Sequence, residues 1–109
     1  PEGEPKVFVI SSGGSGIPVY RRLQRKNIPF AAGVLYPNDI DYQLARLLAV
    51  QTVTEKPFEK ISEQTFEEAV KLMDSCESVI NAGIIIGSAN HRIVELLEKA
   101  QQDGKLKSL

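Results

Sequence analysis

A cluster of small and polar residues directly follows an apolar run near the start of the chain. The run is Val7–Ile10, and the residues after it are Ser11, Ser12, Gly13, Gly14, Ser15 and Gly16. A glycine-rich turn between a strand and a helix can direct backbone N–H groups at an anion, beside the positive end of the helix dipole. The pattern therefore predicts a site for an anionic or phosphorylated ligand. The alternative is a tight turn that only needs the backbone freedom of glycine.

The turn departs from two well-known phosphate-binding patterns. Gly14 and Gly16 supply two glycines of a dinucleotide fingerprint, but Val19 stands where the third small residue is needed, and the acidic residue expected near Tyr36 is missing. The sequence also lacks Gly-x-x-x-x-Gly-Lys-Ser/Thr, so this chain is not itself a P-loop NTPase. These departures leave a nucleotide or another phosphorylated molecule as the candidate ligand, and the sequence does not identify it.

Further polar residues are expected close to the turn. We predict that Asn38, Asp39 and Asn90 lie beside it and contact the ligand. Asp39 and Asp41 could bind a metal or sugar hydroxyls, but two residues apart they do not share a helix face, and capping of the helix start is the alternative for both. His91 is the sole histidine and has no neighbours at metal-ligand spacing, so we expect neither a metal site nor a catalytic residue.

The elements that must position these residues alternate between strand and helix. Strands are expected at residues 6–10, 29–35, 51–54 and 78–82, and an amphipathic helix follows each of them. This alternation predicts an α/β fold, a three-layer Rossmann-like domain with a parallel sheet of about four strands in the order 3-2-1-4. Ligands of such sheets lie beyond the carboxyl ends of the strands, where the segments 11–16 and 83–90 would meet.

Two apolar patterns bear on how the helices pack. The helix that begins near Asn38 is expected to bury a stripe formed by Ile40, Leu44, Leu47 and Leu48. Ile84-Ile85-Ile86 lies between two glycines and has two interpretations: a buried strand, or a loop whose exposed isoleucines form a partner surface or the wall of an apolar ligand site.

Composition limits the class of protein. A chain of 109 residues suits one domain, and its net charge of −1 gives no basis for nucleic-acid binding. No apolar run is long enough to insert into a membrane, and the single cysteine fits a cytoplasmic setting. We interpret residues 1–5 as a linker and residues 6–109 as one domain of a longer protein, cut before a last strand that begins near Lys105.

Several motifs together resemble a known family. They are Gly13–Pro18, Gly33-Val34-Leu35, Asp39-Ile40-Asp41 with Ala45, and Pro57-Phe58-Glu59-Lys60-Ile61-Ser62. In this order the chain resembles the C-terminal Rossmann-like domain of ABC transporter ATPases of the iron(III)-siderophore and cobalamin class, over about residues 7–100. The segment 82–89 departs from that pattern, since the family is richer there in proline and glycine.

The resemblance implies an accessory or regulatory module. An ATPase domain that binds ATP and magnesium would precede Pro1, a permease would be a further partner, and the protein would lie in the cytoplasm at the inner membrane. The module would sense a small ligand at the glycine turn. The alternatives are a dimerisation module that holds two ATPase subunits together through Ile84–Ile86, giving a homodimer, and an enzyme domain acting on a nucleotide or corrinoid.

Overall fold

The computed structural model describes residues 3–36, 39–55, 61–84 and 91–108. Strands and helices alternate along these residues, as the sequence predicts. In chain order the elements are β1 (Val7–Ser12), the short 3-10 helix η1 (Gly13–Gly16), α1 (Ile17–Arg25), β2 (Phe30–Leu35), α2 (Asp39–Leu48), β3 (Gln51–Thr52), α3 (Glu63–Ser75), β4 (Ser78–Ala82), α4 (His91–Gln102) and β5 (Leu106–Ser108).

The strands form one parallel sheet in the order β3-β2-β1-β4-β5. The predicted order 3-2-1-4 is confirmed. A fifth strand, β5, pairs with β4 after Lys105, where the sequence was expected to stop before a last strand. Central β1 pairs with β2 from Val7 to Ser12 and with β4 as far as Ser11. From β1 the chain first adds β2 and β3 on one side of the sheet and then β4 and β5 on the other side. The point where this order reverses lies between β1 and β4.

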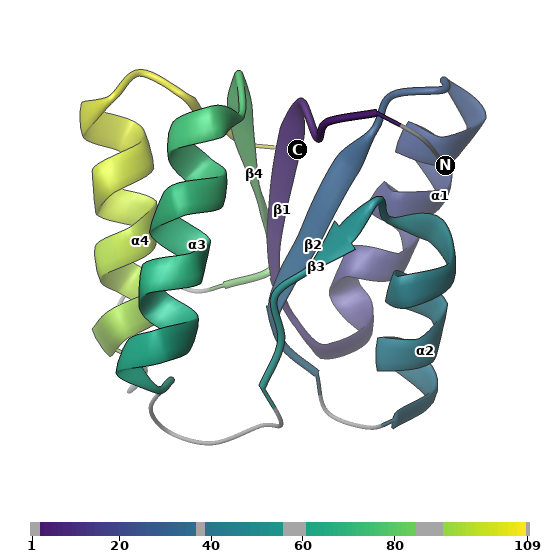
Figure 1. Ribbon diagram of the computed structural model, residues 1–109, viewed down its shortest axis with the longest axis horizontal. Helices are drawn as coiled ribbons and strands as arrows, with labels where there is room; N and C mark the ends of the chain where they lie inside the picture. The colour runs from purple at the N-terminus through teal and green to yellow at the C-terminus, as the bar shows by residue number, and fades with distance from the viewer. Residues whose placement is uncertain (1–2, 37–38, 56–60, 85–90, 109) are drawn as a thin grey trace.

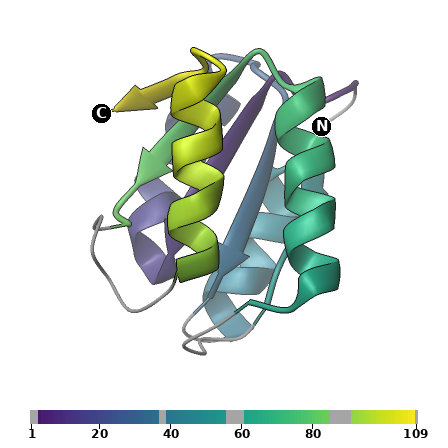
Figure 2. The same ribbon diagram turned by 90° about the vertical axis from the view of Figure 1, so that its left-hand side faces the viewer.

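The helices cover both faces of the sheet, which makes three layers (Figure 1). Helices α1 and α2 lie on one face and α3 and α4 on the other, where Figure 2 shows them side by side. This arrangement buries both faces of the central strands, which explains why β1 and β2 are almost uniformly apolar. The fold is therefore Rossmann-like, as predicted.

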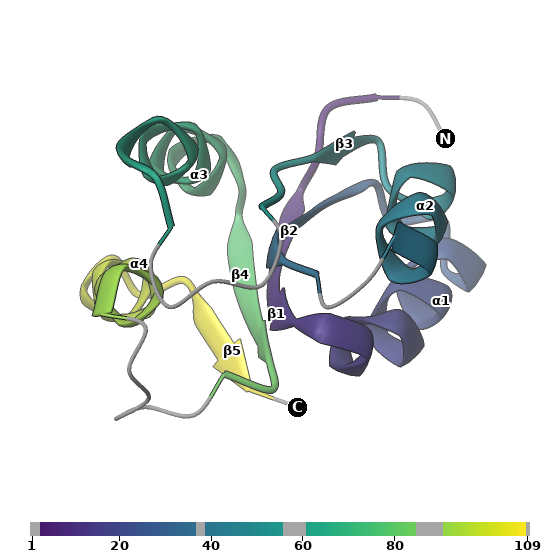
Figure 3. The same cartoon turned by 90° about the horizontal axis from the view of Figure 1, so that it is seen from below.

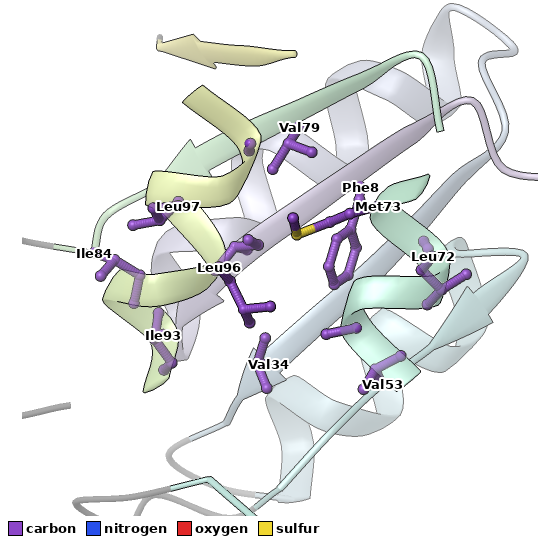
Figure 4. Packing of buried hydrophobic residues seen from close by; sticks show 14 of the residues in the cluster. Phe8, Val34, Val53, Leu72, Met73, Val79, Ile84, Ile93, Leu96 and Leu97 are labelled. Atoms are coloured by element: carbon purple, nitrogen blue, oxygen red, sulfur yellow. The ribbon is translucent and has the colours of Figure 1, made fainter. Parts of the chain in front are cut away.

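Each face of the sheet has its own hydrophobic core. Phe8, Val34 and Val79 from the strands meet Met73 from α3 and Leu96 from α4 on one face (Figure 4). All four residues expected to face inward from the last helix are buried: Ile93, Leu96, Leu97 and Ala100. On the opposite face, Tyr20 of α1 stacks on Phe30 of β2 with ring centroids 5.4 Å apart.

The predicted buried stripe on α2 is wrong at Ile40 and Leu47, whereas Leu44 and Leu48 pack against the core. Ile40 and Leu47 are 79% and 70% exposed, whereas Ala45 and Leu48 are buried. Tyr42, Ala45 and Leu48 form the side of α2 that packs into the core on this face of the sheet. Small Ala45 lets α2 approach its neighbours closely, and turning the helix this way leaves Ile40 and Leu47 on the outside.

Ile84 follows neither of its two interpretations. Strand β4 ends at Ala82, yet the Ile84 side chain is buried against α4. The Asn81 side chain holds the Ile84 backbone by donating to its carbonyl oxygen at 3.0 Å and accepting from its N–H at 2.8 Å. Ile84 is therefore a core residue beyond the strand, and Ile85 and Ile86 lie outside the described residues.

Candidate functional site at the carboxyl edge of the sheet

The glycine turn lies where β1 ends, beside the carboxyl end of β4. Figure 3 views the molecule from this end and shows the chain leaving β1 and entering α1, with α2 next to α1. Ligands of parallel sheets bind at this edge, where neighbouring strands connect to opposite faces. The fold therefore places the glycine turn at the edge of the sheet where the sequence predicts a site.

Most side chains of the turn have structural partners. The Ser15 hydroxyl donates to the carbonyl oxygen of Ala82 at 2.5 Å, which ties the turn to the end of β4. A Cβ added to Gly16 would lie 2.7 Å from the hydroxyl oxygens of both Ser11 and Tyr20. Gly83 has φ +110°, and a Cβ there would lie 2.7 Å from Ser15 Oγ. Gly16 and Gly83 are thus required by close packing.

Three buried hydroxyls form a chain beneath the turn. Ser11 Oγ and Tyr20 Oη share a hydrogen bond of 3.1 Å, and Tyr20 Oη and Tyr36 Oη share one of 3.2 Å. Burial is the main cause that raises the pKa of both tyrosines, and the nearby Asp41 carboxylate adds to it. The phenols therefore stay neutral, and the hydroxyl chain fixes the end of β1 against α1 and the end of β2.

Asp41 in the first turn of α2 reaches the tip of the glycine turn. Its carboxylate oxygens lie 3.7 and 3.9 Å from the position of a Cβ at Gly14. Asp41 is half-buried, and Ser12 and Gly14 beside it are exposed. A carboxylate at this distance repels a bound phosphate but accepts hydrogen bonds from hydroxyl groups.

The structure brings together only some of the predicted site residues. Ser12, Gly14 and Ser15 lie with the turn, while Ser11 and Gly16 are buried below it. Gly13 opens η1. Asp39 is exposed at the start of α2. Asn38 and Asn90, predicted beside the turn, lie outside the described residues.

Sequence reasoning missed Tyr20 and Tyr36 as polar residues. Tyr20 is not among the predicted site residues, and Tyr36 entered only as the position where a dinucleotide fingerprint would have its acidic residue. A signal was present, because a buried tyrosine usually needs a hydrogen-bond partner for its hydroxyl. Two tyrosines at inward positions, with Ser11 after the first strand, could have indicated a shared polar contact.

Metal chemistry has no support in the described part of the chain. No group of three or more His, Cys, Asp or Glu side chains there could hold a metal ion. The guanidinium of Arg92 lies over the Phe66 ring and bonds to Glu63 and Glu95, at 2.8 and 2.9 Å, so it serves the contact between α3 and α4. At the glycine turn, Asp41 is therefore a single carboxylate and not part of a metal-binding cluster in the described ranges.

Comparison with known proteins identifies the family. The family model MJ0874 matches residues 30–108. A relative, "Uncharacterized protein MJ0874" of Methanocaldococcus jannaschii, is 35% identical over 68 residues, which cover 62% of this chain and 73% of the relative. The chain belongs to the MJ0874 family. No solved structure matches it.

Membership of the MJ0874 family overturns the resemblance to ABC transporter ATPases. The match covers the residues that carried most of that resemblance, including Gly33–Leu35, Asp39–Asp41 and 57–62, and gives no link to transporters. Short strand–turn–helix motifs recur in unrelated Rossmann-like folds, so their order indicated the fold and not the function. The ATPase domain, permease, ATP with magnesium and inner-membrane location lose their basis. None of the helices in the described ranges has the length and apolar character of a membrane span.

Proposed function

We propose that this member of the MJ0874 family is a binding module for a small hydroxyl-bearing molecule, of the nucleoside or sugar class. The observation that carries the proposal is the Asp41 carboxylate beside exposed Gly14, at the edge of the sheet where Rossmann-like folds bind ligands. The ligand is held at Ser12, Gly14 and Asp41.

The charge at the turn selects the ligand chemistry. A carboxylate is an acceptor with two oxygens, which suits neighbouring hydroxyls of a pentose. A phosphate placed at Gly14 would lie close to the negative charge of Asp41, and the repulsion between them opposes its binding. The proposal therefore keeps the predicted location and replaces the predicted anionic ligand with a hydroxyl-bearing one.

The hydroxyl chain below the turn supports the site indirectly. Ser11, Tyr20 and Tyr36 hold the end of β1 and the end of β2 in fixed positions. Ser15 holds the other side of the turn on β4. A binding surface whose backbone is already ordered loses less conformational entropy when the ligand binds.

Thermal unfolding against nucleosides, pentoses and their monophosphates tests this function. A ligand at 100 times its Kd adds about 2.7 kcal/mol to stability, which raises the melting temperature by several degrees in a domain of this size. We expect a nucleoside such as adenosine to stabilise the protein more than its 5′-monophosphate does.

Variants locate the binding. Asp41→Ala should abolish the nucleoside effect, and Asp41→Asn should narrow the difference between nucleoside and monophosphate by removing the negative charge. Asp39→Ala should keep the nucleoside effect, which would assign the binding to Asp41 and not to its neighbour. Glu68→Gln on α3 is the control for the loss of an exposed negative charge and should also keep the effect. No stabilisation by any hydroxyl-bearing compound, or a nucleoside effect that persists in Asp41→Ala, would rule the proposal out.

A further inference from the structure

The outer side of α2 carries exposed apolar side chains that no element of the described ranges covers. Ile40 and Leu47 are the large hydrophobic residues most exposed in the described part of the chain, at 79% and 70%. They lie seven residues apart, so they share one face of the helix, with Gln43 between them and partly buried Leu44 at its border. Scattered exposed hydrophobics are ordinary, but Ile40 and Leu47 share one helical face and partly buried Leu44 links them into a stripe.

The stripe has charges of opposite sign at its two ends. Asp39 in the first turn and Arg46 in the last turn are both exposed. They too are seven residues apart and therefore lie along the same border of the stripe. The α2 helix flanks the molecule beside the short edge strand β3 (Figure 1), so a second molecule can approach it.

We propose that this face of α2 pairs with the same face of a second copy of the chain. In a two-fold antiparallel arrangement, Ile40 of one copy packs against Leu47 of the other, and each such contact occurs twice. The same operation brings Asp39 of one copy beside Arg46 of the other at both ends. Antiparallel pairing also aligns the two helix dipoles favourably.

The charge pattern favours a second copy over a different protein. The face carries one acidic and one basic residue, placed so that reversal of the helix exchanges their positions. A partner of uniform charge would oppose one of these residues with a like charge, which weakens binding. A second copy in the reversed orientation places opposite charges beside each other at both ends. This surface is separate from Asp41, which faces the glycine turn.

Sedimentation velocity over a range of concentrations tests the dimer. We expect the 109-residue chain to shift from monomer to dimer as concentration rises, and Leu47→Lys to remain monomeric with an unchanged circular dichroism spectrum. Gln24→Lys on exposed α1 is the matched control and should dimerise like the unmodified chain.

Charge exchange tests the arrangement of the two helices. Asp39→Arg alone and Arg46→Asp alone should each weaken the dimer about tenfold, because like charges then meet at both ends. The double variant should regain most of the affinity. Three results would overturn the proposal: a chain that is monomeric at every concentration, a dimer that Leu47→Lys leaves intact, or a double variant that dimerises as weakly as the single ones. The first result would indicate that the exposed face of α2 binds a different molecule.

Discussion

At the scale of single residues, the hydroxyl of Tyr20 is the middle member of the buried hydroxyl chain below the site. It bonds to Ser11 and Tyr36, and all three side chains are buried. Tyr20→Phe removes the middle hydroxyl and leaves two buried hydroxyls without this partner, so we expect a loss of about 1–3 kcal/mol in the free energy of unfolding. Urea denaturation measures it. Tyr42→Phe, at a half-buried ring outside the chain of hydroxyls, should change stability much less, and equal losses would contradict the role of the chain.

The same tyrosines make stability depend on alkaline pH. Burial raises the folded-state pKa of Tyr20 and Tyr36 above the ordinary value of about 10, so the folded protein retains protons that the unfolded chain loses. Their contribution is complete below pH 10 and falls as the pH rises above it. We expect the urea midpoint to decline above about pH 10, and tyrosinate absorbance from these two residues to appear together with unfolding. Ionisation of all three tyrosines in the folded protein would contradict this assignment.

At the scale of elements, the glycines of the turn differ in what they tolerate. A Cβ at Gly16 would meet Ser11 and Tyr20 oxygens at 2.7 Å, whereas a Cβ at Gly14 would meet only Asp41 at 3.7 Å, an ordinary contact distance. We expect Gly16→Ala to cost about 1–3 kcal/mol by overpacking and Gly14→Ala to change stability little. Thermal unfolding of both variants checks this, and a stable Gly16→Ala protein would contradict the described packing.

The sequence predicted elements best where only one apolar pattern exists. Strand β4 and the buried face of α4 match their predictions because Ile93, Leu96, Leu97 and Ala100 form a single stripe. In α2, two overlapping stripes are present, and periodicity alone cannot tell which one faces the sheet. Neighbouring α1 decides it by packing against Ala45 and Tyr42, a contact between elements that local sequence does not encode.

At the scale of the whole molecule, the alternation of elements predicted the strand order and placed the glycine turn at the carboxyl edge of the sheet. It did not predict which acidic residue reaches the turn, since that depends on how α2 is rotated against α1. Asp41, and not Asp39, is the carboxylate that lies beside Gly14 of the turn. The family relationship likewise emerged from a match over residues 30–108 and not from the short motifs.

Chemical-shift mapping of the nitrogen-15-labelled chain with adenosine tests the central claim most directly. A ligand at Ser12, Gly14 and Asp41 should shift the amide signals of η1 and of the first turn of α2. The signals of α3 should remain in place, because this helix covers the opposite face of the sheet. Shifts confined to α3 and α4, or no shifts at all with adenosine and with a pentose, would contradict a hydroxyl-binding site at the glycine turn.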